Sequence, residues 1–382
     1  MGLCNAMKKI KIMYFVAGLK SGGVEQMLVN YCSKMDKQRF EFVVVYQHEP
    51  VQACLDKITQ AGCSTVRITA RCDNFLKSVW DTYKVINEYK PDIIHSNMNL
   101  MNFIPNTIAK YKGIKVRISH SHIAEKGKGR AYLTFKLLCQ KLIINSSNVF
   151  LACGSDAGTY LHGNKISSTL IHNAIDIDEL SSYCVNNDKD ECFKDKIVIG
   201  HAGRFTEQKN HKKLIDIFEA FLEKCPDAIL LLAGTGELKD SIKQYVDKKK
   251  LTKQVIFLGV VSNMNQFYAN VDLFLLPSLF EGFPVVALET QAAGIKSIFS
   301  DTIDPAVQIT SLVTLMSIQK SNEAWADKMC QILQAMTDDT ENINTNLIKL
   351  RNAGYDVTAE ATKLQDIYLQ ALRCVCQGEN IK

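Results

Sequence analysis

Two positively charged side chains, Arg204 and Lys209, follow a short apolar segment and stand five residues apart. We expect residues 197–201 to form a strand, with Gly203 at its end, where the backbone can come close to a ligand. In open parallel sheets, ligands bind beyond the carboxyl ends of the strands, where helices begin. Arginine and lysine at such a place can hold a diphosphate group. A solvated surface loop could carry the same residues, so this motif alone leaves that alternative open.

Two glutamates, Glu281 and Glu289, stand eight residues apart after another apolar segment, 272–276. Pro284 lies between them and suits the first turn of a helix. The backbone N–H groups of residues 283–286 would then be unpaired donors that can hold phosphate or sugar oxygens. Glu289 would face the same site from within the helix, where its carboxylate could accept hydrogen bonds from the paired hydroxyls of a ribose or hexose ring.

A pair of glycines, Gly22 and Gly23, follows the expected strand 11–16 and precedes the expected helix 24–35. Their spacing is not G-x-G-x-x-G, and the chain has no G-x-x-x-x-G-K-[ST] motif, so neither a nicotinamide-dinucleotide fingerprint nor a P-loop is present. The pair lets the backbone approach a ligand closely, or it simply forms a tight turn.

Strand-like and helix-like segments alternate in both halves of the chain, which predicts parallel sheets with right-handed crossovers. A polar, turn-rich stretch at 173–195 separates the halves. We therefore expect two doubly wound α/β domains, 1–185 and 186–360, and a C-terminal helix at 361–382 that packs back on the first domain. The expected strands are 11–16, 42–46, 92–95, 115–119, 148–152, 168–172, 197–201, 228–233, 255–258 and 272–276; the expected helices are 24–35, 75–89, 132–144, 211–224, 238–249 and three in the tail from about 322.

The charge of the chain is uneven. Residues 1–180 hold 23 Lys and Arg against 14 Asp and Glu, a net +9, and residues 181–382 hold 22 against 26, a net −4. A basic half can face nucleic acid, an anionic membrane or a phosphorylated substrate.

Nine of the basic residues lie within 110–141, including Lys126, Lys128 and Arg130. Basic and apolar residues interleave on the following helix, which suits an anionic membrane surface. The alternative is a core-packed helix with a solvated basic face. No nucleic-acid reader motif accompanies the charge, so we expect no nucleic-acid partner.

The composition, 47% hydrophobic and 22% charged, excludes disordered and collagen-like chains. No run of eighteen apolar residues occurs, the first residues lack the apolar core of a signal peptide, and Ala6 stands where a myristoylation site needs Ser or Thr. The thirteen cysteines form no C-x-x-C pair and are typical of cytosolic thiols. We expect a cytoplasmic protein, peripheral at the inner face of the cell membrane.

Taken together, these motifs resemble those of the family 4 retaining glycosyltransferases with the B-type fold of two Rossmann-like domains, GT-B. They are most similar to those of bacterial capsular and exopolysaccharide transferases. The matching motifs cover most of the chain: Gly22 to Glu25, Arg117 to His122, His172 to Asp176, Gly203-Arg204 with Lys209, Gly234 to Gly236, Glu281 to Glu289, and Ala353 to Asp356.

The resemblance implies that the first domain binds the acceptor and the second binds the donor, across an interdomain cleft. Arg204 and Lys209 would neutralise the departing diphosphate, Glu289 would hold the ribose, and Glu281 would contact the transferred sugar. His120 matches the active-site histidine; His122 is either its partner or a surface histidine. The implied catalytic residues are His120, Glu281, Arg204 and Lys209; the other implied donor-binding residues are Gly22, Gly23, Gly203, Gly234, Gly236, Gly282, Phe283, Pro284, Val285 and Glu289.

The implied activity is retaining transfer of a sugar, expected from a UDP-sugar, to a growing lipid-linked saccharide in cell-surface polysaccharide synthesis. The alternatives are a sugar-nucleotide 2-epimerase of the same fold and a non-catalytic, sugar-nucleotide-binding partner subunit. Asp176 and Asp178 form a D-x-D pair, which binds metal in other transferases, but no His or Asp cluster surrounds them. We interpret the pair as a hinge or a helix cap, and we expect neither a metal nor another cofactor.

Overall fold

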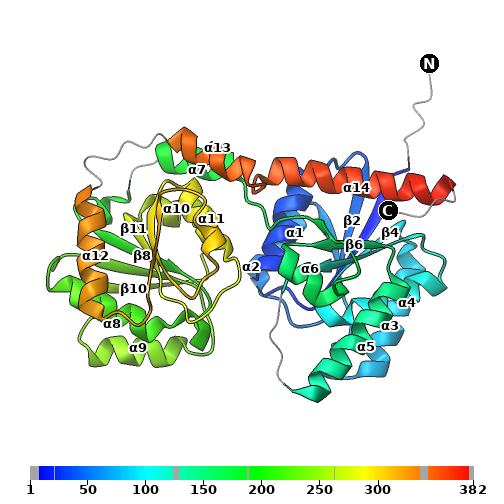
Figure 1. The fold of residues 1–382 in the computed structure, drawn as a ribbon, viewed down its shortest axis with the longest axis horizontal. Coiled ribbons are helices and arrows are strands. Elements are labelled where there is room, and N and C mark those ends of the chain that lie inside the picture. Colours follow the sequence, from blue (N-terminus) through cyan, green and yellow to red (C-terminus); the bar gives the residue numbers. More distant parts are fainter. Residues whose placement is uncertain are drawn as a thin grey trace. The chain divides into compact units, whose positions relative to one another are not determined.

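The computed structural model describes residues 8–20, 22–123, 129–186, 189–261, 263–335 and 343–377. The chain divides into two units, and each contains one parallel sheet flanked by helices (Figure 1). The N-terminal unit combines residues 1–174 with 357–382, and the C-terminal unit comprises residues 175–356. The expected fold class, two doubly wound α/β domains, is confirmed.

The N-terminal unit has a seven-stranded sheet in the order β3-β2-β1-β4-β5-β6-β7, and each neighbouring pair is parallel. The order reverses between β1 and β4, which pair Tyr14 with His95. Ligands of open α/β sheets bind at such a switch point, beyond the carboxyl ends of the strands. The strands are β1 (Ile10–Val16), β2 (Phe40–Tyr46), β3 (Cys63–Arg67), β4 (Ile93–Asn97), β5 (Val116–Ser121), β6 (Val149–Ala152) and β7 (Thr169–Leu170).

Alternate strand residues of this sheet face two different helix layers, as the period of two requires. Tyr14 belongs to the core that includes α1, α2 and α14, whereas Phe15 belongs to the core that includes α3 and α4. A smaller cluster joins α5 and α6. The helices are α1 (Gly23–Lys34), α2 (Gln52–Gln60), α3 (Phe75–Tyr89), the 3-10 helix η1 (Asn99–Asn102), α4 (Phe103–Tyr111), α5 (Arg130–Ser146), α6 (Ser155–His162) and α14 (Val357–Gln377).

Helix α14 brings the last part of the chain back to the N-terminal unit, where it lies beside α1 (Figure 1, red). Leu364, Tyr368 and Ala371 follow each other at helical spacing and are buried in the core that contains α1. Burying one large apolar side chain contributes roughly 1.5–3 kcal/mol, so this face holds the helix in place. It also inserts a tyrosine hydroxyl close to β1 and β4.

The C-terminal unit repeats the same strand order with six strands, β10-β9-β8-β11-β12-β13, again parallel. Its switch point lies between β8 and β11. The strands are β8 (Val198–Ala202), β9 (Ile229–Ala233), β10 (Val255–Gly259), β11 (Leu273–Leu276), β12 (Lys296–Ser300) and β13 (Val313–Met316).

Two cores cover the faces of this second sheet. One packs β8, β9 and β11 against α10, α11 and α13, and the other packs the opposite strand faces against α8, α9 and α12. The helices are α7 (Ile177–Asn186), the 3-10 helices η2 (Glu191–Phe193), η3 (Glu207–Lys209) and η4 (Pro305–Val307), α8 (His211–Leu222), α9 (Lys239–Lys248), α10 (Met264–Ala269), α11 (Val285–Ala292), α12 (Asn322–Gln334) and α13 (Ile343–Asn352).

The unit boundaries differ from the predicted ones, 185/186 and 360/361. The chain enters the C-terminal unit at Ile175, because the polar stretch contains α7, whose Ile177 and Leu180 belong to the core of that unit. It returns to the N-terminal unit at Val357, which is buried there. Strands β3, β12 and β13 were not among the predicted strands. The three helices predicted in the tail correspond to α12, α13 and α14.

Candidate active site

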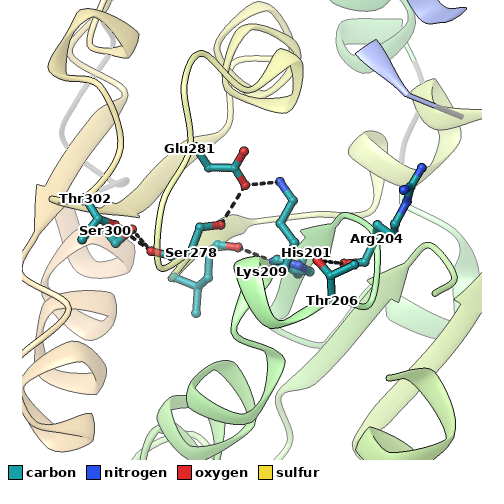
Figure 2. A network of polar contacts seen from close by, with 9 residues as sticks. His201, Arg204, Thr206, Lys209, Ser278, Glu281, Ser300 and Thr302 are labelled. Atoms are coloured by element: carbon teal, nitrogen blue, oxygen red, sulfur yellow. Dashed lines mark hydrogen bonds and ion pairs between the residues drawn. The ribbon is translucent and has the colours of Figure 1, made fainter. Parts of the chain in front are cut away.

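The cationic pair predicted to hold a diphosphate lies at the end of β8, beside the switch point. Lys209 closes η3, and its side chain crosses over Gly203, where an added Cβ would lie 2.9 Å from Lys209 Cε. Glycine at 203 therefore provides the space that the lysine stem occupies. Arg204 is exposed, and Figure 2 shows its guanidinium directed away from Lys209. The two cations thus extend from the same strand end in different directions.

Gly234 and Gly236 support the backbone of this loop. An added Cβ would lie 2.0 Å from the Gly203 carbonyl oxygen at Gly234 and 2.5 Å from the Phe205 carbonyl oxygen at Gly236. The amide of Phe205 donates a 3.0 Å hydrogen bond to the Thr235 carbonyl. The loops after β8 and β9 therefore pack backbone against backbone, and only glycine permits that approach.

Lys209 and Glu281, predicted separately from two motifs, form an ion pair. Lys209 Nζ lies 2.6 Å from Glu281 Oε1, and the two side chains are only 14% and 10% exposed (Figure 2). The hydroxyl of Ser278 donates a 3.1 Å hydrogen bond to the same carboxylate oxygen. A charge pair that is mostly removed from water interacts more strongly than a surface pair. The pair therefore holds the loops after β8 and β11 together.

Further polar contacts extend this support to the loop after β12. The carbonyl of Ser278 accepts hydrogen bonds from the hydroxyls of Ser300 at 2.6 Å and Thr302 at 2.7 Å (Figure 2). The amide of Leu279 donates to the Gln208 carbonyl at 2.8 Å. Three strand-end loops are thus fixed around Glu281, which is the pre-organisation that a binding site for a charged ligand needs.

Glu289 lies on α11, one turn inside the helix, as predicted. Its Oε2 accepts a 2.6 Å hydrogen bond from the hydroxyl of Tyr268, a buried residue of α10. Burial, and then the charge of Glu289, raise the pKa of Tyr268, so the phenol remains a donor. Pro284 precedes the helix as its N-cap, one position earlier than predicted. The carboxylate is therefore held in one orientation by a partner that the sequence analysis missed.

The residues between the two glutamates form an open approach to α11. Gly282 is exposed, and nothing lies within 4 Å of an added Cβ there. Phe283 stacks on Tyr355, with ring centroids 4.9 Å apart. Val285 begins the helix, so its N–H and that of Val286 are donors without intrahelical partners. This edge can therefore accept the oxygens of a phosphate or a sugar.

Two buried histidines lie beneath this edge. His201 Nδ1 donates a 2.8 Å hydrogen bond to the Leu275 carbonyl, and the His211 ring stacks on Phe205 at 4.0 Å. Burial lowers the pKa of His201 to about 4, and burial with neighbouring positive charge lowers the pKa of His211 to about 2. Both rings are neutral at pH 7. The positive charge of the edge therefore comes from Arg204 and Lys209.

In the N-terminal unit, the predicted glycine pair begins α1. Gly22 is the N-cap, and an added Cβ would lie 2.6 Å from the carboxylate of Glu25, which accepts a hydrogen bond from the Lys20 amide. Gly23 is exposed, and the nearest atom to an added Cβ there is Nδ2 of Asn173, at 4.0 Å. The start of α1 therefore lies open beside Asn173, a residue of one of the matching motifs.

The two histidines at the end of β5, His120 and His122, differ in exposure. His120 is fully buried within the strand, whereas His122, just after the strand end, is half-buried. Their ring centroids are 4.0 Å apart. His122 Nε2 lies 2.8 Å from Asn97 Oδ1, and Asn97 Nδ2 donates to the His95 carbonyl at 3.3 Å. His122, rather than the predicted His120, thus has the more accessible ring.

The two aspartates of the D-x-D pair form contacts at the start of α7. Asp176 Oδ1 accepts a 3.1 Å hydrogen bond from the Glu179 amide, which is a helix-capping contact, and Asp178 forms an ion pair with Arg351. Within the described ranges, no group of three His, Cys, Asp or Glu side chains could hold a metal ion.

The predicted basic segment is described in part. Lys126 and Lys128 lie outside the described residues, and Arg130 begins α5. None of the described helices is both long and apolar enough to span a membrane.

Comparison with known proteins assigns both units. Residues 21–179 match the model of the Glycosyltransferase Family 4, and residues 186–349 match the model of the Glycosyl transferases group 1. EpsF of Bacillus subtilis (strain 168), a protein named as a glycosyltransferase, is 28% identical over 94% of this chain and 96% of its own.

Two further relatives match along nearly their full lengths. An Escherichia coli protein, named UDP-Gal:alpha-D-GlcNAc-diphosphoundecaprenol alpha-1,3-galactosyltransferase, is 22% identical over 94% of this chain and 97% of its own. The crystal structure of Anabaena HepE in complex with UDP superposes with a TM-score of 0.73 at 18% identity, over 94% of this chain and 99% of that one.

Fold and matches together define a glycosyltransferase of the GT-B fold. Within that class, the chain belongs to the family 4 glycosyltransferases, with a group 1 domain as its C-terminal part.

Proposed function

We propose that this glycosyltransferase moves a sugar from a UDP-sugar to a growing lipid-linked saccharide in cell-surface polysaccharide synthesis, with retention of configuration. The observation that carries the proposal is the ion pair of Lys209 and Glu281 at the switch point of the C-terminal unit, with Arg204 and Glu289 on the same sheet edge. These four charged groups match the parts of a nucleotide-sugar: two anionic phosphates, a ribose diol and a hexose.

The proposed roles follow from the chemistry of each group. Lys209 and Arg204 neutralise the diphosphate, and the developing charge of the leaving oxygen is stabilised by groups that are already in place. Glu289, oriented by Tyr268, accepts hydrogen bonds from the ribose. Glu281 exchanges part of its contact with Lys209 for hydroxyls of the transferred sugar. The backbone of Gly22 and Gly23 in the N-terminal unit approaches the donor phosphates.

The nature of the donor and acceptor is supported by the relatives. HepE is described as binding UDP, and the name of the Escherichia coli relative gives UDP-galactose as donor and an undecaprenol-linked saccharide as acceptor. The capsular polysaccharide biosynthesis glycosyltransferase CapM of Staphylococcus aureus is 29% identical over 36% of this chain and 37% of its own. We infer the same classes of donor and acceptor here.

Retention and metal independence are parts of the proposal. Retention rests on the family alone, and the NMR spectrum of the product linkage tests it: an α-linked donor should give an α-linked product. Metal independence rests on the two cations, which take the role of a divalent ion at the diphosphate. Turnover in EDTA should equal turnover with Mg²⁺ or Mn²⁺, and activity that needs the added ion would contradict it.

One assay separates the proposed activity from its two alternatives. The transferase releases free UDP only when an acceptor saccharide is present. An epimerase would interconvert the sugar-nucleotide without an acceptor, and a non-catalytic binding subunit would leave it unchanged. Acceptor-dependent UDP release together with a lengthened saccharide would support the proposal, and either alternative outcome would refute it.

We further propose that α3 and α5 dock the N-terminal unit on an anionic membrane, where a lipid-linked acceptor lies. Both helices follow strands of the parallel sheet and therefore begin at the same sheet edge as His122. Their exposed faces interleave apolar and basic residues, the pattern of surface-bound helices. The large apolar residues on these faces are Phe75, Leu76, Trp80, Leu133, Phe135, Leu137 and Leu138, and the basic residues are Lys77, Lys84, Arg130 and Lys141.

Vesicle sedimentation tests the docking face. Replacing Arg130 and Lys141 with Gln should reduce binding to phosphatidylglycerol vesicles about tenfold or more, because each basic residue near such a surface contributes on the order of 1 kcal/mol. Leu137→Ser should weaken binding as well. Ile348→Ser changes an equally exposed apolar residue of α13 and should have no effect. Unchanged sedimentation of the first two variants would place the docking surface elsewhere.

A further inference from the structure

A continuous chain of buried hydrogen bonds leads from the C-terminal helix to the histidine pair of the N-terminal unit. The hydroxyl of Tyr14 on β1 lies 2.8 Å from the hydroxyl of Tyr368 on α14, which lies 2.7 Å from His95 Nδ1. His95 Nε2 lies 3.1 Å from His120 Nδ1. All four side chains are completely buried. The chain ends at the ring against which His122 packs.

Burying these polar side chains in place of apolar ones costs stability, which indicates that the arrangement has a function. Polar groups in a sheet interior gain little net stability even when they are hydrogen-bonded, and apolar residues of similar size would serve packing at least as well. On each of the three strands, the residue two positions earlier on the same face is apolar: Ile12 on β1, Ile93 on β4 and Ile118 on β5. The buried polar side chains form one connected line of hydrogen bonds that ends at His120. Such a network indicates that the orientation of this histidine matters.

The tautomers of the two buried histidine rings are coupled. Burial lowers the pKa values of His95 and His120 well below the usual range, so each ring is neutral and has one donor and one acceptor nitrogen. His120 uses Nδ1 toward His95, and its Nε2 forms no hydrogen bond among the described residues. The hydrogen bond between the two rings needs a proton on only one of its two nitrogens, so the tautomer of His95 fixes that of His120.

The hydroxyl of Tyr368 contacts the other nitrogen of His95 and so selects between the two coupled states. When this hydroxyl donates to His95 Nδ1, His95 Nε2 donates to His120 Nδ1, and the proton of His120 lies on Nε2. When it accepts from His95 Nδ1, the proton of His120 lies on Nδ1. Burial raises the pKa values of both tyrosines well above the usual range, so both remain protonated donors.

We propose that Tyr368 and His95 are positioning residues that hold His120 in a single tautomer and fix the ring on which His122 packs. His122, with its Nε2 on Asn97, is then the histidine presented to the substrate. The C-terminal helix, which returns to the N-terminal unit after the whole donor-binding unit, thus completes the site of the first unit. The catalytic consequence rests on the proposed transferase function; the tautomer assignment does not.

The first test is a spectroscopic one and needs no activity. In protein with ¹⁵N-labelled histidine, long-range ¹H–¹⁵N correlation NMR spectra report which ring nitrogen carries the proton. His120 should be present as a single tautomer in the parent, and Tyr368→Phe should shift it toward a mixture of both forms. Tyr160→Phe removes another buried tyrosine hydroxyl, which lies 2.6 Å from the hydroxyl of Tyr132, and should leave His120 unchanged. A mixture of both tautomers in the parent, or no response to Tyr368→Phe, would overturn the proposal.

The second test separates positioning from stability. Tyr368→Phe should lower kcat about tenfold with little change in the KM for the donor, because the charged groups proposed to hold the donor lie in the C-terminal unit. Tyr160→Phe should change neither. The double variant His95→Leu with Tyr368→Phe removes both partners and should regain much of the lost thermal stability while kcat stays low. His95→Gln keeps an N–H that can reach His120 and should retain more activity than His95→Leu. If the double variant recovers kcat with stability, the chain is merely structural and the proposal fails.

Discussion

The two units have the same strand order but present opposite chemistry at the carboxyl edges of their sheets. In the C-terminal unit, the loops after β8 and β11 carry a charged pair, Lys209 with Glu281, which retains some exposure to solvent. In the N-terminal unit, the ends of β4 and β5 carry His95 and His120, completely buried and hydrogen-bonded. One topology thus supports a charged edge and a neutral one.

The difference shows how burial decides which ligand an edge suits. Burial disfavours the charged form of a group, so the histidines of the N-terminal unit stay neutral, whereas the lysine keeps its charge because it is paired and not fully removed from water. A charged edge suits the diphosphate of a donor. A neutral edge of hydrogen-bonding groups suits hydroxyls, without attracting the anionic donor away from the other unit.

Lowering the pH should increase the difference between the two units. Of the effects predicted here, it should change stability most. Burial lowers the pKa values of His95 and His120, and those of His122 and His162 to about 4, in the N-terminal unit. The unfolded chain, with histidine pKa values of about 6.5, binds more protons below that pH, so stability is lost as the pH falls below about 6.5. Each such histidine should cost about 2 kcal/mol at pH 5.

Calorimetric unfolding between pH 7.5 and pH 5 measures this loss. The N-terminal unit, with four histidines of lowered pKa among its described residues, should lose more than the C-terminal unit, where the corresponding residues are His201 and His211. Hydrogen exchange at the two pH values assigns the loss to each unit. Equal losses in both units, or none, would contradict the contrast.

Removing the lysine of the charged edge should have the next largest effect. Lys209→Ala deletes a charge-assisted contact worth roughly 1.5–3 kcal/mol and leaves Glu281 unpaired beside the phosphates. Donor affinity should fall about a hundredfold, as measured by calorimetric titration. The additional Glu281→Gln exchange should recover part of it. Lys213→Ala removes a nearby half-buried lysine and serves as the control; its ammonium donates to the Lys320 carbonyl. A comparable loss in this control would mean that only the overall charge matters.

A smaller effect is expected at the ribose contact. Tyr268→Phe removes the hydroxyl that orients Glu289 but keeps the ring, so donor affinity should fall about threefold to tenfold, in line with one hydrogen bond of about 1 kcal/mol. Tyr245→Phe removes a surface hydroxyl that bonds to Asp216 and should leave affinity unchanged. If the two variants behave alike, Tyr268 does not position the carboxylate.

The sequence predicted the charged edge better than the neutral one. Arg204, Lys209, Glu281 and Glu289 lie in two short motifs beside glycines and a proline, so their spacing alone locates them at strand ends. The structure brings Lys209 and Glu281 into contact, which no spacing could show because they come from different loops. The supporting hydroxyl of Tyr268 lies 21 residues before Glu289, on another helix.

The neutral edge depends on contacts between distant parts of the chain. Tyr368 and His95 are separated by 273 positions, and no local pattern links them. The sequence predicted that the C-terminal helix packs on the N-terminal unit, but not that a hydroxyl of this helix enters the sheet. The sequence analysis also favoured His120 over His122 as the active-site histidine. The alternation of side chains along a strand does not reveal which of two histidines on one face is covered by a helix.

The most direct test of the donor site is a calorimetric titration of UDP into the parent protein, Arg204→Ala and Glu289→Ala. Each substitution removes a charge-assisted contact, with the phosphates in one case and with the ribose in the other. UDP should bind the parent, and each variant should bind it at least tenfold more weakly, which corresponds to about 1.4 kcal/mol. Unchanged affinity in both variants would place the nucleotide-sugar elsewhere and contradict the charged edge as the donor site.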